Sequence, residues 1–167
     1  MTDNKSSKEI KSLSQKGYLA LLKLDLINVV GLKNEKREEV IKVLIKINEL
    51  SWTLFFIAQG SKLNESDVEN LKNLAKEKKF KELDEFLRKK YPQIEYNISY
   101  YSLLAKEMVI AQNLGKLMAI LKISDIKDKE ISLKEVEYLA NLVRMRKWEE
   151  FSKRYKVLNK IRKSLNE

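Results

Sequence analysis

Residues 63–83 read LNESDVENLKNLAKEKKFKEL and contain the signals for two short helices joined by a turn. Asn64 is a favourable N-cap residue, and Asp67 stands three positions later in the first turn. Apolar residues recur at helical spacing up to a basic break at residues 77–79, and Phe80 opens a second helix. That helix must end before Pro92, because proline disfavours a helical conformation in the residue before it. The stretch therefore predicts a helical hairpin.

A second stretch, ISLKEVEYLANLVRMRKWEEF at residues 131–151, is similar to the first. At an offset of 68 positions, seven of 21 residues are identical, and Trp148 takes the place of Phe80. Ser132 and Glu135 have the spacing of a capping box. We interpret the two stretches as parts of a duplicated three-helix unit, with repeat units 35–91 and 98–160 and the first helix outside them. Convergence between two hairpins rich in Lys and Leu is the alternative.

Turn-forming residues are scarce in the rest of the chain. Four Gly and one Pro among 167 residues argue against many strands and favour long helices with brief loops. The chain is 44% hydrophobic and 35% charged, which is typical of a folded domain with a well-solvated surface. We therefore predict an all-α fold, a helical bundle of about six to seven helices in a single domain over residues 1–167.

The other helices follow from hydrophobic periodicity. A first helix is predicted over about 6–30, a central helix containing Trp52 over about 35–58, and a third over roughly 98–123. A basic helix ends the chain. The buried side of the first helix is expected to carry Leu13, Ala20, Leu21, Leu24, Ile27 and Val30.

The residue types needed for catalysis are largely missing. The chain has no Cys and no His, which removes thiolate ligands, the commonest metal ligand and the commonest general base. Its glycines are isolated, so there is no phosphate-binding loop. The adjacent carboxylates Glu38-Glu39, Asp84-Glu85 and Glu149-Glu150 are expected to be surface charges paired with nearby Lys. We predict a protein that is not an enzyme and uses no cofactor or metal.

No apolar run approaches the length of a membrane span, and the polar first residues do not resemble a signal peptide. A cytoplasmic location without membrane contact is the resulting expectation.

The net charge of +10 is concentrated near the end of the chain. Residues 141–167 hold nine basic and three acidic residues, a net +6, whereas residues 101–140 balance at zero. Drawn as a helix, this segment has one apolar stripe, formed by Trp148, Phe151, Tyr155, Leu158, Ile161 and Leu165. Arg146, Lys153 and Lys160 fall almost opposite that stripe, with Lys156 and Lys163 beside them.

A row of cations on the outer face of a packed helix can follow a line of phosphates. The predicted nucleic-acid-binding residues are Arg146, Lys147, Lys153, Lys156, Lys160 and Lys163, with Lys76, Lys78 and Lys79 as a weaker second patch. A solvated surface that serves solubility alone is the alternative. Tyr96, Tyr100 and Tyr101 could stack on unpaired bases, although such tyrosines more often wedge helix junctions.

Residues 99–122, SYYSLLAKEMVIAQNLGKLMAILK, resemble the core helix of the small, helical, non-catalytic subunits of type III CRISPR effector complexes. The residues that carry the resemblance are Tyr101, Ser102, Leu103, Asn113, Leu114, Gly115, Leu117, Ala119, Leu121 and Lys122. Residues 15–20, QKGYLA, are similar to the family's first helix, and residues 35–92 form an insertion relative to its pattern. The resemblance implies an antiviral-defence subunit that stacks with copies of itself along a ribonucleoprotein filament and contacts the backbones of the guide and target strands.

The leading hypothesis is a non-catalytic structural subunit of a ribonucleoprotein assembly that binds RNA or single-stranded DNA through its phosphates, without sequence specificity. Other protein subunits, including copies of itself, would be its partners. The first alternative is a helical protein-interaction module with no nucleic-acid role. The second is a stand-alone DNA-binding protein, which is less favoured because no helix starts with the expected mixture of Arg, Asn, Gln and Ser.

Overall fold

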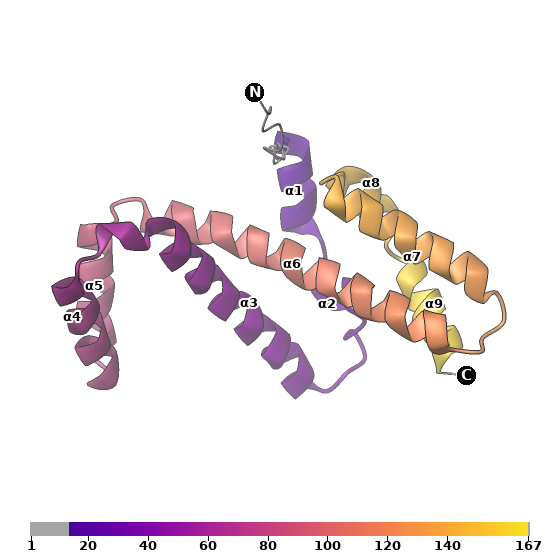
Figure 1. Ribbon diagram of the computed structural model, residues 1–167, viewed down its shortest axis with the longest axis horizontal. Helices are drawn as coiled ribbons and strands as arrows, with labels where there is room; N and C mark the ends of the chain where they lie inside the picture. The colour runs from indigo at the N-terminus through magenta and orange to yellow at the C-terminus, as the bar shows by residue number, and fades with distance from the viewer. Residues whose placement is uncertain (1–13, 167) are drawn as a thin grey trace, which may run out of the picture. The chain divides into compact units, whose positions relative to one another are not determined.

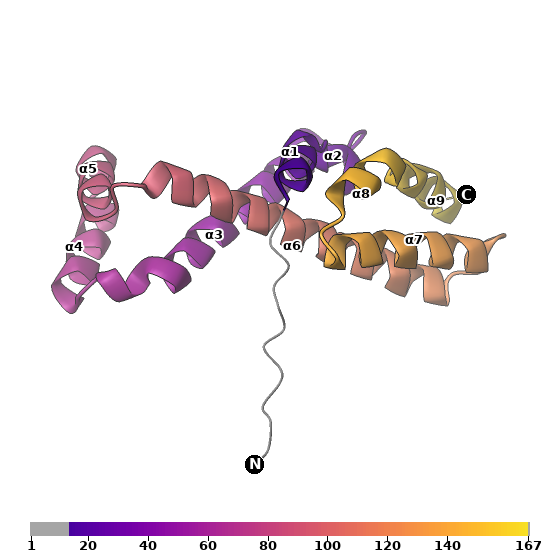
Figure 2. The same ribbon diagram turned by 90° about the horizontal axis from the view of Figure 1, so that it is seen from above.

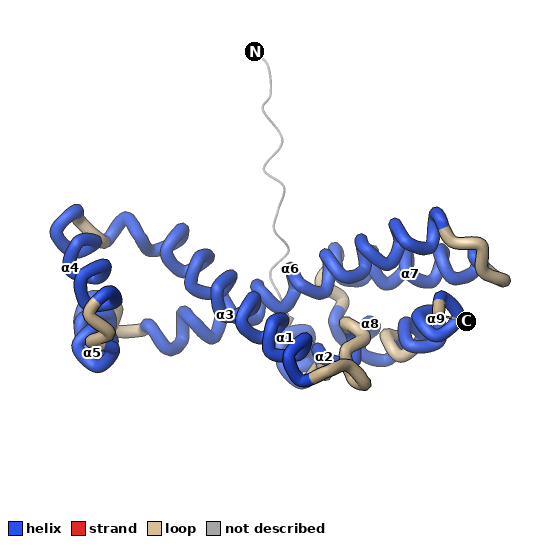
Figure 3. The backbone as a smooth tube through the Cα atoms, turned by 90° about the horizontal axis from the view of Figure 1, so that it is seen from below, coloured by secondary structure: helices blue, strands red, loops and turns tan. Residues whose placement is uncertain are grey.

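A computed structural model describes residues 14–166, and 81% of these residues are helical. The described residues form nine α-helices and one short 3-10 helix, joined by brief loops and without a strand (Figure 3). The all-α prediction is therefore confirmed, although the helices outnumber the six to seven expected. Their bounds are α1 Gln15–Lys23, α2 Leu26–Val29, α3 Arg37–Gln59, η1 Gly60–Lys62, α4 Glu65–Lys76, α5 Phe80–Lys90, α6 Ile94–Ile123, α7 Lys129–Arg144, α8 Trp148–Arg154 and α9 Val157–Leu165.

The chain divides into two compact units, which we describe separately. The middle unit comprises residues 37–109, and the split unit comprises residues 1–36 together with 110–167. Helix α6 contributes its first part to the middle unit and its second part to the split unit. The single domain and the repeat boundaries expected from the sequence stay predictions.

The middle unit is held by an aromatic core. Phe55 of α3 is fully buried, and its ring lies 4.9 Å from the ring of Tyr91 in an edge-to-face arrangement. The Tyr91 hydroxyl donates a hydrogen bond to the carbonyl of Gln59, 3.1 Å away, which satisfies its polar end. Leu87 and Ile94 complete the buried cluster. Helices α4 and α5 form an antiparallel hairpin beside this core (Figure 1).

The split unit is built around the apolar stripe of the last segment. Helix α8 packs against both α1 and α7, and α9 packs against α2 and α7 (Figure 2). Trp148, which was expected in the core, is 1% exposed and packs edge to face on Phe151. Tyr155, Leu158 and Ile161 are also buried, as the helical drawing of this segment predicts.

The prediction of one long first helix is wrong within the described residues. Leu24 adopts an extended conformation, and the Asp25 carboxylate accepts a hydrogen bond from the backbone N–H of Asn28 at 3.1 Å. Asp25 therefore acts as the N-cap of a separate short helix, α2. Leu21, Leu24 and Val30 are buried as expected, Ala20 and Ile27 are half-buried, and Leu13 lies outside the described residues.

Two other predicted helix boundaries also need correction. Helix α7 begins at Lys129, so Ser132 lies inside it, and Glu135 binds Arg154 instead of closing a capping box. The basic C-terminal helix is two helices, because residues 155 and 156 form a tight turn in which the Leu158 N–H bonds to the Tyr155 carbonyl. The N-cap predicted at Asn64 is confirmed, and Asp67 completes a capping box, because each side chain accepts from the other residue's backbone N–H.

The two hairpins have the same turn. Lys78, between α4 and α5, has a φ of 58°, and Arg146, between α7 and α8, has a φ of 54°. The two turns also have the same pair of backbone hydrogen bonds, 68 positions apart. In the first turn, the Lys79 N–H donates to the Leu74 carbonyl and the Lys78 N–H to the Ala75 carbonyl. In the second, the Lys147 N–H donates to the Leu142 carbonyl and the Arg146 N–H to the Val143 carbonyl. These are the bonds of a Schellman motif, which ends a helix on a left-handed residue.

Candidate nucleic-acid interface

Positive charge is distributed unequally between the two units. The split unit contains 21 basic and 12 acidic residues, a net +9, and the middle unit contains 13 basic and 12 acidic residues, a net +1. Nearly all of the net charge of +10 thus belongs to the unit that contains the C-terminal helices. An excess of this size attracts polyanions and raises their local concentration.

The six predicted binding residues of the C-terminal segment lie on three successive elements. Arg146 and Lys147 form the turn before α8, Lys153 lies on α8, and Lys156 lies at the break between α8 and α9. Lys160 and Lys163 lie on α9. All except the half-buried Arg146 are exposed. Because α8 and α9 are separate helices, these cations do not form a row on one continuous helix.

Pairing separates these cations into two kinds. Lys147 pairs with Glu150 at 3.3 Å, which reduces its value as a binding charge. Lys153, Lys156 and Lys160 form no ion pair or hydrogen bond through their ammonium groups with any described residue. Those three lysines are the cations of the segment that remain available to an external anion.

Two arginines of the same segment hold the unit together. Arg154 pairs with Glu135 on α7 at 2.7 Å, and its guanidinium lies 4.8 Å from the ring centre of Tyr138. Hydrogen bonding to Glu135 raises the pKa of Arg154. Arg162 donates to the carbonyl of Val29 at 2.6 Å and to the Asn113 side chain at 2.8 Å. Neither arginine was among the predicted nucleic-acid-binding residues.

Two surface hollows of the split unit gather these charges. Arg146, Lys147 and Lys153 line a hollow of about 350 Å³ beside the first turn of α1, together with Glu149 and Glu150. Lys163 lines a second hollow of about 390 Å³, together with Lys33 and Arg162. Neither hollow includes Lys156 or Lys160. The structure therefore brings Arg146, Lys147 and Lys153 together at one hollow and leaves Lys156 and Lys160 outside both. Lys163 instead lies with Lys33 and Arg162, which the sequence did not indicate.

The weaker patch predicted on the middle unit is partly neutralised. Lys76, Lys78 and Lys79 are exposed around the turn between α4 and α5. Lys79 binds the Glu77 carboxylate at 2.7 Å, and this hydrogen bond raises the pKa of Lys79. Three adjacent cations thus supply less net charge than their number indicates.

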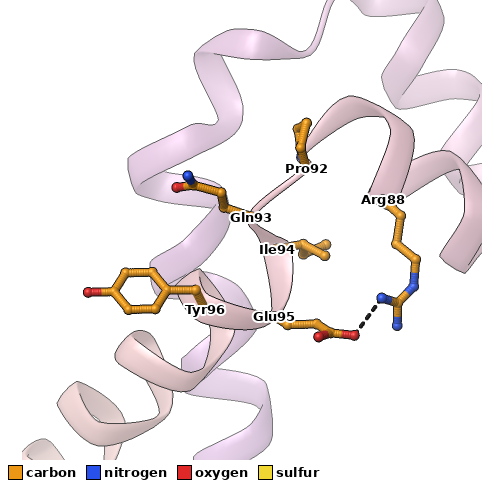
Figure 4. A pocket seen from close by; sticks show the side chains of 6 residues that line it. All are labelled: Arg88, Pro92, Gln93, Ile94, Glu95 and Tyr96. Carbon is orange, nitrogen blue, oxygen red and sulfur yellow. Dashed lines mark hydrogen bonds and ion pairs between the residues drawn. The ribbon is translucent and has the colours of Figure 1, made fainter.

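The tyrosines after Pro92 have different environments. Tyr101 packs edge to face on Phe55 and belongs to the core of the middle unit, whereas Tyr96 is 73% exposed. Tyr96 lines a hollow of about 500 Å³ beside Arg88 and Glu95 (Figure 4). Arg88 donates to both Asp84 and Glu95, and these hydrogen bonds raise its pKa. Its charge is balanced, so this hollow offers an aromatic ring without an available cation.

Carboxylates are dispersed over the surface. Of the six carboxylates expected to pair with nearby Lys, Glu39 and Glu150 pair with a lysine within one helical turn, and Asp84 pairs with Arg88. Their neighbours Glu38, Glu85 and Glu149 form no ion pair with a described residue. No group of three or more acidic residues within residues 14–166 is placed to hold a metal ion. None of the described helices is both long and apolar enough to cross a membrane.

Comparison of the chain with family models, curated proteins and solved structures finds no match.

Proposed function

We propose that this chain is a non-catalytic structural subunit of a cytoplasmic ribonucleoprotein assembly and contacts the phosphate backbone of RNA or single-stranded DNA. The observation that carries the proposal is the net charge of +9 on the split unit, together with the unpaired ammonium groups of Lys153, Lys156 and Lys160 within residues 14–166. Lysine acts on phosphate as a point charge and releases condensed counterions. Such contacts position a strand without reading its bases.

The resemblance to the small subunits of type III CRISPR effector complexes supports membership of an assembly. The residues that carry it lie on α6, where Leu103, Leu114, Leu117 and Leu121 are buried. The Asn113 side chain donates a hydrogen bond to the Val30 carbonyl and accepts one from Arg162. A polar residue that belongs to the resemblance thus helps to attach the basic helix α9.

Binding of fluorescent single-stranded RNA, single-stranded DNA and duplex DNA, followed by anisotropy, tests the proposal. If four phosphates are contacted, the affinity for a single strand should fall roughly 50-fold between about 50 and about 200 mM salt. Replacing Lys153, Lys156 and Lys160 together by Glu should reduce the affinity. The slope of log affinity against log salt concentration should also become less steep, by about two.

A matched control has the same change in charge on the other unit. Lys72, Lys81 and Lys89 of the middle unit are exposed and form no ion pair within the described chain, so their replacement by Glu should leave affinity nearly unchanged. Equal weakening by both triple variants would show attraction by overall charge rather than by this surface. No binding at the lower salt concentration would contradict a nucleic-acid role for the isolated chain.

A protein-interaction role is the second candidate, and one observation favours it. Ile41, Leu44 and Ile45 of α3 are 41%, 52% and 51% exposed, so residues 14–166 leave an apolar surface of the middle unit exposed. Light scattering across a concentration series would detect self-association, and Leu44→Ser combined with Ile45→Ser should abolish it. If the protein is a monomer at every concentration and binds RNA in a salt-dependent manner, only the nucleic-acid proposal remains.

A further inference from the structure

Arg162 has an unusual set of partners for a half-buried arginine. Its Nη2 donates to the Val29 carbonyl and to the Asn113 side-chain oxygen, and its Nη1 lies 3.5 Å from the Asn159 side-chain oxygen. These acceptors are all neutral, and none is a carboxylate. Burial lowers the pKa of the guanidinium, because desolvation disfavours the charged form. A positive charge therefore stands in a partly dry position without a compensating negative charge.

Part of the guanidinium also remains without a hydrogen-bond acceptor. Arginine carries five N–H donors in a planar fork. The described contacts of Arg162 involve only Nη1 and Nη2, and no described residue accepts from Nε. An oxyanion suits such a group, because it can accept a charge-assisted hydrogen bond from the Nε–H that remains.

The surroundings of Arg162 provide space and further positive charge. The second hollow, of about 390 Å³, is bounded by the loop between α2 and α3 and by α9, all within the split unit. Lys33 reaches it from the loop and Lys163 from α9. The backbone N–H groups of Lys33 and Asn34 have no acceptor within residues 14–166. We call this hollow the Arg162 cleft.

Two residues restrict what the Arg162 cleft can hold. Gly31 lets the loop pass close to the arginine, because a Cβ at this position would lie 2.7 Å from both Cδ and Nε of Arg162. Glu35 also lines the cleft and forms no ion pair with a described residue, so it repels an anion. Three cations against one carboxylate leave a net positive site that is large enough for one phosphate group with part of its sugar.

We propose that the Arg162 cleft binds a single phosphate group, with the guanidinium of Arg162 and the ammonium groups of Lys33 and Lys163 as its recognition groups. The inference rests on the proposed function in one respect, namely that the phosphate belongs to a nucleic-acid strand. That phosphate is either a terminal group or a link in the backbone. The cleft would fix the position of one phosphate, and Lys153, Lys156 and Lys160 would contact others less specifically.

The first experiment uses inorganic pyrophosphate as the probe and the full chain as the protein. Titration followed by NMR should move the Arg162 Nε–H and Gly31 N–H resonances in a saturable manner. Lys33→Gln should weaken this binding roughly fivefold to tenfold, the size expected for one charge-assisted hydrogen bond. Glu35→Gln should strengthen it, because a repelling charge is removed.

Lys116→Gln is the matched control, since Lys116 is an exposed cation of the same unit that does not line the cleft. Arg162 itself is left intact in these tests, because its loss would also detach α9 from α2. Equal effects of Lys33→Gln and Lys116→Gln, or unchanged Arg162 resonances under pyrophosphate, would overturn the proposal.

The second experiment compares two short single-stranded RNAs that differ only in a terminal phosphate or a terminal hydroxyl. Tighter binding of the phosphorylated strand, abolished by Lys33→Gln, identifies a strand end. Equal affinities with shifted Arg162 resonances identify a backbone phosphate. If RNA binds without shifting the Arg162 and Gly31 resonances, the phosphate-binding role of the Arg162 cleft is contradicted, whereas the proposed function is retained. If the protein binds pyrophosphate but no RNA, the proposed function is contradicted, whereas the Arg162 cleft is still supported as a phosphate site.

Discussion

Gly31 and Arg162 are in close contact, and each restricts what the other position can hold. Gly31 has a φ of 82°, a conformation that residues with a side chain rarely adopt. The Arg162 side chain occupies the space where a Cβ of residue 31 would lie, and its two hydrogen bonds through Nη2 hold it there. The loop can approach α9 only because residue 31 has no side chain.

Gly31→Ala is therefore expected to destabilise the protein by about 1–3 kcal/mol, from backbone strain and the displacement of Arg162. The free energy of unfolding in urea measures the effect. Gly115→Ala is the control, because Gly115 is exposed within α6 and a Cβ there would meet nothing within 4 Å. That change should stabilise the protein by about 0.5–1 kcal/mol through helix propensity. Equal effects of the two substitutions would contradict this account.

At the scale of elements, the two helical hairpins place ordinary side chains where a turn prefers glycine. The Schellman turn requires a left-handed residue, and the chain has Lys78 in one copy and Arg146 in the other. A left-handed conformation costs an L-residue roughly 1–2 kcal/mol, of which glycine avoids most. Both hairpins thus contain strain that the rest of each unit outweighs.

Lys78→Gly should raise the free energy of unfolding by about 0.5–1 kcal/mol, since relief of strain exceeds the added freedom of the unfolded chain. Lys72→Gly, an exposed position in the middle of α4, should lower it by about as much, because glycine weakens a helix interior. Thermal unfolding of both variants and the parent protein checks the difference in sign. A loss of stability in Lys78→Gly would show that the lysine side chain contributes more than its backbone conformation costs.

Acid should weaken the α4–α5 hairpin through Asp67. Its carboxylate accepts hydrogen bonds from the Lys90 ammonium and the Asn64 N–H, and these hold its pKa below the usual value of 3.8. The unfolded chain then binds the proton more tightly, so the stabilisation is present above about pH 4 and is lost as pH falls through the lower, folded pKa.

Asp67→Asn removes the charge and retains the shape of the side chain. The stability difference between this variant and the parent should be constant from about pH 7 to about pH 5 and should disappear in stronger acid. Urea unfolding from about pH 7 to about pH 2 measures it, with Glu65→Gln in the same turn as a control for a charge without a bonded partner. A difference that does not change with pH would show that Asp67 stabilises α4 by some other means.

Sequence signals within one helical turn predict most helices correctly. The predictions fail where contacts between residues distant in the sequence determine the structure. Asn64 caps α4 as predicted, and Asp67 completes a capping box with it, because both partners lie within one turn. Ser132 and Glu135 have the same spacing, but Glu135 binds Arg154, which lies 19 positions further along the chain. The break at residues 155–156 contains neither Gly nor Pro, so no turn signal marks it. The buried stripe was predictable from periodicity, whereas the bond from Arg162 to Val29 spans 133 positions and has no periodic signal.

At the scale of the whole molecule, the two units differ in charge far more than in size. The split unit has a net +9 and the middle unit a net +1. The cations of the split unit repel one another, and that repulsion opposes its folding. The middle unit, in contrast, has its charges nearly balanced and several of them paired.

Added salt should therefore stabilise the split unit and have little effect on the middle unit. Between about 50 mM and about 500 mM sodium chloride, we expect a gain on the order of 1 kcal/mol in the split unit, since screening shortens the reach of surface charges. Amide hydrogen exchange at Leu114 and Leu158 reports on the split unit, and exchange at Phe55 and Leu87 reports on the middle unit. A uniform response of all four positions would contradict an origin in the charge difference.

The contact between Gly31 and Arg162 also has a consequence for evolution. Substitution of Arg162 leaves the Val29 carbonyl and Asn113 without their donor, and a side chain at residue 31 displaces the arginine. The glycine, the asparagine and the arginine can therefore change only together. In diverged relatives, a glycine before the long α3 helix, an asparagine in the middle of α6 and an arginine 49 positions after it should persist as one signature. Homologues that have lost most other sequence similarity would be recognisable by these three residues.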